Sequence, residues 1–457
     1  MPQIAFGTQS YRDESLPLSA QRMVNCYLEP APPKAKTFAA VKPFFGINTL
    51  STVGTGPMRG GLVVNDVMYV VSGLKLYRVA NDGNATELGE IPGTDRVSMA
   101  ADETNVMIVS QLSGYVCNGS TVQQIPDEDF PGAEWVVNFD GYFVVGEPAS
   151  GEFAISANRD PLTWDGLDFA SAEKYPDNLV RGIAQLGELA LLGRESGEIW
   201  VDTGGADFPL TKSDAGIWEV GIWSRDAAAK ADNTIFFVGH EGIVYRLNGY
   251  TPQRVSTAAI EQAIRKAADP DIRMLAWVEN GHSFVGLFSK AFGFVYDCST
   301  QLWCERLSFG RSTWRAAFVL LSNKRLYVGD TESGQFGELS PDVFTDFGDV
   351  LRMSCTAPSL SEDNLWIFLD RLELVFEQGV GTLATRDPQV MLTAYDHGGR
   401  VKLWEKNRAL GRMGEFKTMV VFTRGGRSRD MVLELSITDP VRRTLILATA
   451  DTRVGTH

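Results

Sequence analysis

The chain has 457 residues, 44 % of them hydrophobic, with 45 Gly, 20 Pro, 10 Trp, 12 Tyr and 25 Phe, which supports a large folded core and excludes wholesale disorder. Its formal net charge of −15 argues against a protein that grips DNA phosphates over a broad surface. Five scattered Cys and four His argue against a disulfide scaffold and a His-rich metal site.

The sequence opens without the basic and apolar stretches of a secretory signal, and no apolar run approaches the ~18 residues of a membrane helix. We therefore expect a soluble protein that is made in the cytoplasm and has no membrane span. Residues 352–457 carry 15 Lys and Arg and 13 Asp and Glu, a net charge of +2, whereas residues 1–351 carry 27 and 44, a net charge of −17. This asymmetry indicates two regions with different neighbours, unless the acid serves only solubility.

Residues 1–56 are rich in proline, with Pro30, Pro32 and Pro33 close together. Because proline fixes φ and removes a backbone donor, this segment is predicted to be an extended arm rather than a domain. It also contains large apolar residues such as Phe44 and Phe45, which indicate that the arm lies on a surface of its own chain or of a neighbour.

From about residue 57 a pattern of short apolar strands and Gly, Asn or Asp turns recurs. Seven units begin near residues 61, 98, 137, 183, 228, 275 and 316, at a spacing of about 42 residues. This period is typical of β-propeller blades, whose apolar faces are buried by radial stacking. We predict a propeller over residues 57–350, with six or seven blades because two units could combine into one. A β-sandwich or a run of smaller β-domains is the alternative.

Hairpin turns are predicted at residues 65–66, 140–141, 232–233, 280–281 and 322–323, where Asn, Asp, Gly and Ser favour tight turns. Residues 257–268 place Ile260, Ala263 and Ile264 at helical spacing before Asp269-Pro270. We expect a helix there, between the fifth and sixth units. It either packs on the propeller rim or forms an interface.

Residues 351–457 lose the 42-residue period. Alternating apolar residues predict strands at 369–376, 390–395, 401–404, 417–423 and 431–438. Five strands within about 90 residues indicate a separate C-terminal antiparallel β-sandwich domain, so the whole chain is predicted to be all-β.

The sequence contains no phosphate-binding loop, nucleophile elbow, HExxH zinc motif or calcium loop. With 57 Asp and Glu residues, carboxylate pairs arise by chance and do not indicate a glycosidase. We therefore expect no enzyme, no cofactor and no metal site. A basic cluster at Arg424, Arg427 and Arg429 either contacts a phosphate or an acidic partner, or is a solvated turn.

Three stretches, in order along the chain, resemble one family. They are residues 15–30 of the arm, the first repeats with Gly56-Pro-Met-Arg-Gly-Gly61 and Arg96-Val-Ser-Met-Ala100, and the last domain with Asp396-His-Gly-Gly-Arg400 and Gly426-Arg-Ser-Arg-Asp430. Together they resemble the packaged-DNA stabilisation proteins of short-tailed bacteriophages, also called tail accessory, tail hub or nozzle proteins. His397 departs from the turn expected in that family.

The resemblance implies a structural virion protein of the tail, made and assembled in the host cytoplasm. It implies a ring, typically a homo-hexamer, below the portal–adaptor complex. Such a ring extends the DNA channel, helps to retain packaged DNA and docks the tail needle or the fibre and spike proteins. Double-stranded DNA would pass without sequence-specific binding. The alternatives are a non-viral propeller that serves as a protein-interaction scaffold and a glycan-active tail enzyme.

The charge fits a DNA conduit in part, because a negative wall does not hold DNA that must slide past it. Ring closure needs head-to-tail contacts, and an apolar arm laid over a neighbour would supply them. Subunit or partner contacts are therefore expected at Tyr11, Arg12, Leu18, Arg22, Val24, Tyr27, Arg424, Arg427 and Arg429.

Overall fold

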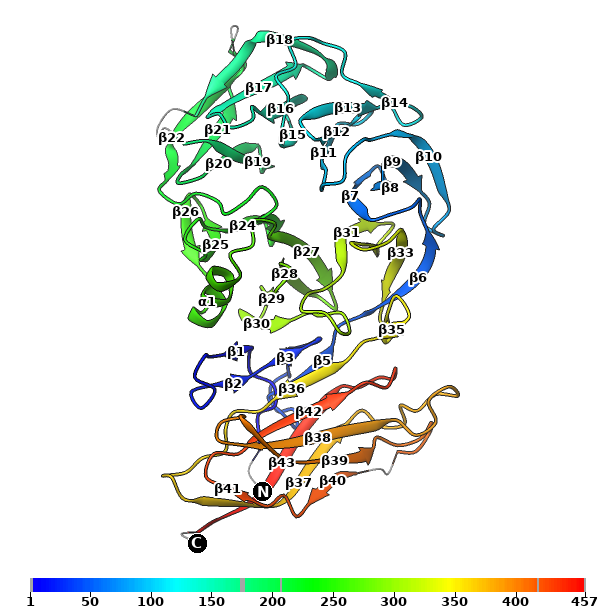
Figure 1. Cartoon of the computed structure of the whole chain (residues 1–457), viewed down its shortest axis with the longest axis vertical. Helices are drawn as coiled ribbons and strands as arrows, with labels where there is room; N and C mark the ends of the chain where they lie inside the picture. Colours follow the sequence, from blue (N-terminus) through cyan, green and yellow to red (C-terminus); the bar gives the residue numbers. More distant parts are fainter. Residues whose placement is uncertain (1–2, 173–176, 206–207, 417–418, 456–457) are drawn as a thin grey trace.

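The computed structural model describes residues 3–172, 177–205, 208–416 and 419–455. Within these residues the chain is all-β except for one helix, α1 (Ala258–Ala267), which lies between the fifth and sixth repeats as predicted. Ile260 and Ile264 face the core, and the left-handed Ala268 (φ 46°) ends the helix. Figure 1 shows a ring of sheets above a layered unit that holds both ends of the chain.

Within the described residues the propeller has seven blades of four antiparallel strands each. Five blades are separate four-stranded sheets, and blades 6 and 7 are parts of a nine-stranded and a six-stranded sheet. Blades 1 to 3 contain β7 (Met58–Val64), β8 (Val67–Ser72), β9 (Lys75–Val79), β10 (Ala85–Glu90), β11 (Ser98–Ala101), β12 (Val106–Ser110), β13 (Ser113–Cys117), β14 (Val122–Gln124), β15 (Val136–Phe139), β16 (Tyr142–Gly146), β17 (Glu152–Ala157) and β18 (Asp160–Ser171). Blades 4 to 6 contain β19 (Leu179–Gln185), β20 (Glu188–Gly193), β21 (Gly197–Asp202), β22 (Leu210–Trp218), β23 (Ala228–Ala231), β24 (Thr234–Val238), β25 (Val244–Asn248), β26 (Thr251–Arg254), β27 (Arg273–Glu279), β28 (His282–Phe288), β29 (Gly293–Asp297) and β30 (Leu302–Glu305).

The seventh blade takes its fourth strand from the beginning of the chain. It combines β31 (Ala316–Ser322), β32 (Arg325–Asp330) and β33 (Gln335–Ser340) with β6 (Gly46–Thr52), and Leu339 lies opposite Ile47 in the β33–β6 ladder. Strand β31 also lies beside β7 of blade 1. The ring is therefore closed by strands from both ends of the repeat region, which covers the edge of β33.

Tight turns join the first two strands of most blades. In the first of them, Asn65 and Asp66 have φ values of 49° and 62°, which match a type I′ hairpin. The same left-handed pair occurs at Asp140–Gly141, Asp232–Asn233 and Asn280–Gly281. These four predicted turns are confirmed. The fifth lies at Asn323–Lys324, one residue later than predicted.

Residues 3–52 form six strands, whereas the sequence predicts an extended arm for this region. Besides β6, these are β1 (Tyr11–Arg12), β2 (Ala20–Gln21), β3 (Met23–Val24), β4 (Cys26–Pro30) and β5 (Ala39–Pro43). Strands β3, β5 and β6 pair with strands from the second half of the chain, and β4 pairs with β5. The expected arm is thus built into the fold, because its backbone donors and acceptors complete sheets that would otherwise end in open edges.

The layered unit is a sandwich of two sheets. Its remaining strands, with the short pair that follows blade 7, are β34 (Thr345–Asp346), β35 (Asp349–Val350), β36 (Met353–Thr356), β37 (Trp366–Phe376), β38 (Gln389–Asp396), β39 (Val401–Ala409), β40 (Val420–Thr423), β41 (Arg427–Ser428), β42 (Val432–Ile437) and β43 (Leu445–Gly455). One sheet has the order β4-β5-β43-β37-β40, and the other contains β36-β42-β38-β39. The predicted strand at 417–423 is described from Val420 onward, because residues 417–418 lie outside the described residues.

A single continuous sheet joins the propeller to the sandwich. Its order is β27-β28-β29-β30-β3-β36-β42-β38-β39, so β3 lies between blade 6 and the sandwich. Val24 pairs in parallel with Glu305 of β30 and in antiparallel with Ser354 of β36. The next residue, Asn25, is buried, and its side chain bonds to both backbone groups of Leu307 at the end of blade 6.

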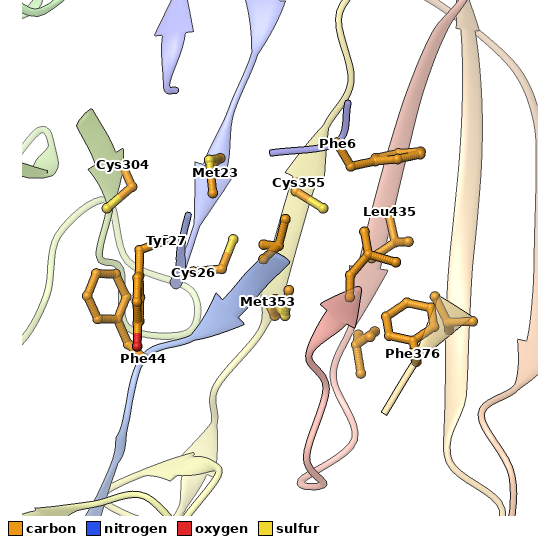
Figure 2. Packing of buried hydrophobic residues seen from close by; sticks show 14 of the residues in the cluster. Phe6, Met23, Cys26, Tyr27, Phe44, Cys304, Met353, Cys355, Phe376 and Leu435 are labelled. Atoms are coloured by element: carbon orange, nitrogen blue, oxygen red, sulfur yellow. The ribbon is translucent and has the colours of Figure 1, made fainter. Parts of the chain in front are cut away.

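The largest hydrophobic core spans this junction. Figure 2 shows its members from the N-terminal strands, blade 6 and both sandwich sheets, including Phe6, Met23, Cys26, Tyr27, Phe44, Cys304, Met353, Cys355, Phe376 and Leu435. Because residues from all these elements share one core, the sandwich is packed directly against blades 6 and 7.

A buried carboxyl group lies where the segment before β6 meets blade 6. Glu279 is 2 % exposed, and its Oε1 accepts a hydrogen bond from the backbone N–H of Phe45 at 2.7 Å. Trp277 donates to the other carboxyl oxygen at 3.3 Å. Burial raises the pKa of Glu279 to about 7, although the nearby Arg306 favours the charged form.

Replacing Asn25 with Ala is expected to lower the thermal stability of the whole chain. The Asn25 amide donates to the carbonyls of Leu307 and Arg352 at 2.9 and 2.8 Å and accepts from the Leu307 N–H at 2.9 Å. Removing these buried bonds should cost about 2–4 kcal/mol. Thermal unfolding measures the loss. The control is Asn65→Ala, which has the same left-handed backbone but an exposed side chain, and an equal loss in both variants would contradict this role.

The loss of thermal stability caused by Glu279→Gln is expected to become smaller as the pH rises. Because the folded-state pKa of Glu279 lies above that of an ordinary Glu, the wild-type protein loses stability from this group as the pH rises from about 4.5 through about 7. The neutral Gln loses none, so the melting temperature of the variant relative to wild type should be higher at pH 8 than at pH 5. The exposed Glu195→Gln is the control, and a pH-independent difference for E279Q would overturn the prediction.

Candidate assembly surfaces

The N-terminal hairpin carries three of the predicted contact residues, the half-buried Tyr11 and the exposed Arg12 and Leu18. Strands β1 and β2 pair through Tyr11 and Gln21, and β1 lies beside α1. The loop between them carries Leu18, whose side chain is 72 % exposed, and Arg12 is also exposed. The hairpin therefore presents an apolar side chain and a cation at the rim between propeller and sandwich, where Figure 1 places β1 and β2.

The hairpin rests on the turn that contains His397. There His397, Gly398 and Gly399 have φ values of 51°, 65° and 98°, and a Cβ on Gly398 would lie 2.4 Å from the Cα of Pro17. Only a residue without a side chain allows this approach, so Gly398 fixes the distance between the two segments.

The other three predicted arm residues hold the chain together internally. Arg22 is half-exposed and forms a two-pronged ion pair with Glu305, with its Nε 2.9 Å from Oε1. Val24 and Tyr27 are buried, and the Tyr27 ring packs 5.2 Å from that of Phe44. Val24 and Tyr27 therefore leave the set of candidate contacts, because this chain's own β30, β36 and blade 6 cover them.

The cluster of Arg424, Arg427 and Arg429 is exposed on the sandwich. The guanidinium groups of Arg427 and Arg429 lie 4.8 and 5.0 Å from the ring centre of Trp366 on β37. Cation–π contacts of this kind hold the charged groups in place while their outer faces stay open to solvent. The sequence pattern indicates the arginines but not Trp366, which lies about 60 residues earlier in the chain.

Three further cations extend this cluster into a face that we call the basic face: Arg424, Arg427, Arg429, Lys406, Arg408 and Arg453. Lys406 donates to the carbonyl of Arg424 at 2.8 Å and lies 4.5 Å from the ring centre of Trp404. Burial, and then repulsion by Arg408 and Arg424, lowers the pKa of Lys406. Arg453 pairs with Asp370, whose carboxylate offsets part of the positive charge.

The axis of the propeller is crossed by arginine side chains. Arg225, just before blade 5, donates from Nη2 to the carbonyl of Arg96 at 2.9 Å and from Nη1 to that of Glu134 at 3.1 Å, at the starts of blades 2 and 3. Arg96 in turn donates to the carbonyl of Ala317 in blade 7 at 3.1 Å. Both arginines contact the carboxylate of Asp226. These bonds tie opposite blades together and obstruct the central passage.

A repeated signal in the sequence could have revealed the axial arginines. Arginine occurs at or just before the first strand of six of the seven repeats, at Arg59, Arg96, Arg181, Arg225, Arg273 and Arg315. The first strands of a propeller line its axis, and four of these side chains, Arg96, Arg181, Arg225 and Arg273, lie near Asp226 there. Arg59 and Arg315 instead bond to groups such as the Ile91 carbonyl and the Asp330 carboxylate.

Within the described residues, no group of three or more His, Cys, Asp and Glu side chains is arranged to hold a metal ion. The described part of the chain also has no helix with the length and apolar character that crossing a bilayer requires.

A sequence profile for the family described as "Bacteriophage P22 Gp10, beta-propeller" matches residues 3–344, which is most of the chain. The chain belongs to this family. Its members are structural phage tail proteins that stabilise packaged DNA, so this Gp10-like protein is a component of the virion tail and not an enzyme. The matched region begins in the N-terminal strands and ends with the seventh blade, before β36.

No curated protein sequence matches the Gp10-like chain. Among solved structures, the β-propeller domain of Cps50 (Swd1) from Myceliophteria thermophila has 7 % identity, a TM-score of 0.45 and coverage of 64 % of this chain and 98 % of its own. YCF48 from Cyanidioschyzon merolae has 11 % identity and a TM-score of 0.44, over 65 % of this chain and 99 % of its own. Likeness at this level says nothing about partners.

Proposed function

We propose that this Gp10-like protein forms a homo-hexameric ring below the portal–adaptor complex of a phage. The ring extends the DNA channel, helps to retain packaged DNA and docks the tail needle or fibre and spike proteins. Double-stranded DNA passes through it without sequence-specific binding, and the ring assembles in the host cytoplasm before it becomes part of the virion tail.

The obstructed propeller axis is the observation that carries this proposal. The bonds from Arg225 to Arg96 and Glu134 cross the central passage of the propeller. A DNA duplex is wider than its own major groove, which measures about 12 Å, so it does not fit past these side chains. A tail protein of this family therefore cannot pass DNA through its own propeller. A channel has to be formed between several copies of the chain, and a closed ring is the symmetric way to form one.

The charge distribution supports contacts between unlike surfaces of neighbouring copies. Residues 1–351 carry a net charge of −17, whereas the basic face lies on the nearly neutral last region. A head-to-tail ring brings different surfaces of two copies together, so the basic face of one copy can meet an acidic blade surface of the next. The acidic side chains that remain on the channel side repel DNA, so DNA slides past them without binding.

We also propose that the chain is divided into three parts. Residues 57–350 form the propeller unit and residues 351–457 the sandwich unit, while residues 1–56 serve both. The hairpin with the exposed Arg12 and Leu18 and the half-buried Tyr11 lies at the rim between the two units and contacts a neighbour or the adaptor.

Reversing the charge of the basic face is expected to prevent ring formation. The variant R424E/R427E/R429E should stay folded, because all three side chains are exposed, but should sediment and appear in electron micrographs as monomers where wild type forms rings. Both proteins are examined alone and with the purified portal–adaptor complex, since the ring can need that platform.

The matched control is R159E/R194E/R386E, which makes the same change in net charge at three exposed arginines elsewhere. If both triple variants assemble like wild type, the basic face is not the interface. If wild type itself forms no ring on the portal–adaptor complex, the proposed function is wrong.

Leu18→Asp is expected to weaken assembly without changing thermal stability. Leu18 loses little packing in the isolated chain because its side chain is largely exposed, but at an interface it would bury apolar area worth about 2 kcal/mol. The titration of protein onto portal–adaptor complexes, read by mass photometry, measures the effect. Leu167→Asp is the control because Leu167 is 82 % exposed on blade 3. If the two variants bind the portal–adaptor complex with equal affinity, the hairpin is not part of the interface.

A further inference from the structure

A pocket of about 460 Å³ lies where the N-terminal hairpin, α1 and blade 6 meet, and we call it the α1 pocket. Strand β1 lies beside α1, and Figure 1 shows both of them near β30 of blade 6. Three separate parts of the chain therefore enclose the pocket. Its volume is within the range of about 300–1,000 Å³ that is typical of binding sites.

Much of the lining of the α1 pocket is apolar. Ala259 and Ala263 line it from α1, while Phe292, Phe294 and Leu307 line it from blade 6 and the residues beside its strands. The rings of Phe292 and Phe294 are stacked with their centres 5.1 Å apart. Because the two alanines are small and only half-buried, they leave room for an incoming Leu or Phe side chain, whose burial removes apolar area from water.

The charged residues of the lining are three arginines and one glutamate, Arg12, Arg22, Arg311 and Glu305. Glu305 is buried and already accepts the two-pronged ion pair from Arg22. Arg311 donates from Nε to Glu332, outside the lining, at 2.7 Å. With both glutamates counted, one positive charge remains. It belongs to Arg12, whose exposed side chain forms no hydrogen bond or ion pair within the described residues.

The acidic side chains closest in sequence to this lining are engaged elsewhere. Asp13, next to Arg12, accepts a hydrogen bond from the backbone N–H of Ser15 at 2.8 Å within the hairpin loop. Glu261, in the first turn of α1, is buried and is bound by Arg254 at 2.7 and 2.8 Å. The α1 pocket is thus a place of positive charge in residues 1–351, whose net charge is −17.

An apolar pocket bordered by arginines matches a segment in which an apolar side chain lies next to a carboxylate. The guanidinium of Arg12 can donate two parallel hydrogen bonds to such a carboxylate, and the apolar lining accepts the neighbouring side chain. A DNA strand fits the pocket poorly, because its phosphates carry no apolar group beside them and the acidic surface of this region repels a polyanion.

We propose that the α1 pocket docks an acidic segment of a partner protein of the tail, in which a Leu or Phe lies next to Asp or Glu. The apolar side chain packs against Ala263 and Phe294, and the carboxylate binds Arg12. The proposal rests on the contact proposed above for the N-terminal hairpin and adds the chemistry of the partner that the hairpin receives.

The test uses fluorescent nine-residue peptides, each with a central Leu, Phe or Trp between aspartates, and measures their binding to the purified full chain by fluorescence anisotropy. We expect at least one peptide to bind saturably with a Kd of about 100 μM or tighter. The same peptide with Asn for Asp, or with Ser for the apolar residue, should bind at least about tenfold more weakly. A single-stranded DNA of equal charge should not displace it.

Arg12→Glu is the decisive variant, because this exposed side chain has no partner to lose and the fold should stay intact. We expect it to weaken peptide binding at least about tenfold. Arg159→Glu makes the same charge change on an exposed turn elsewhere and should bind like wild type. Ala263→Trp should block the pocket, whereas Gln262→Trp, exposed on the same helix and outside the lining, should not.

The proposal is overturned if wild type binds none of the peptides, if R12E binds as tightly as R159E, or if the DNA displaces the peptide. Peptide binding is measured on the free chain and needs no ring. A chain that assembles on the portal–adaptor complex but binds no peptide therefore contradicts this inference alone. A chain that binds the peptide through Arg12 but forms no ring contradicts the proposed function alone.

Discussion

The backbone pairing of the short strand β3 is the constraint on which the rest of the fold depends. Blade 6 ends in β30 and the sandwich begins with β36, and each would otherwise present an open edge to water. Met23 and Val24 fill the space between them and pair with both. Because this strand is followed by the buried Asn25, the two units share one sheet and one core, and their relative orientation is fixed. A subunit of this kind can transmit a contact made by its sandwich to its propeller without a hinge.

The N-terminal strands that follow β3 also close the propeller. After β3 the chain adds β4 and β5 to the sandwich, and then β6 to blade 7. Both units therefore need residues from the two ends of the chain before they are complete. Ile47 and Leu339 in the β6–β33 ladder are 292 residues apart, and Val41 and Leu445 in the β5–β43 ladder are 404 residues apart. Their pairing therefore loses much chain entropy, which the buried core at the junction has to offset.

This separation explains which features the sequence could predict. Each blade is built from hairpins between neighbouring strands, so its apolar alternation and turns such as Asn65–Asp66 are local signals, and they identified the repeat, the helix and the predicted turns. Strands β3, β5 and β6 lie in or beside a proline-rich segment, and nothing local indicates that they pair with β36, β43 and β33. Tyr27 illustrates the consequence. The sequence predicts that this aromatic residue contacts another subunit or a partner, whereas the tertiary structure shows that it packs within its own chain.

The charged residues follow a spatial order that composition conceals. The acidic excess of residues 1–351 coexists with an arginine cluster at the axis of the same propeller and with a basic face on the sandwich. Burying guanidinium groups is unfavourable unless carbonyls or carboxylates receive their hydrogen bonds, and Arg225 meets this condition by reaching carbonyls on opposite blades. The bonds that make this burial possible also obstruct the axis. The unfavourable burial of these charges is thus accompanied by bonds that hold opposite blades of the propeller together.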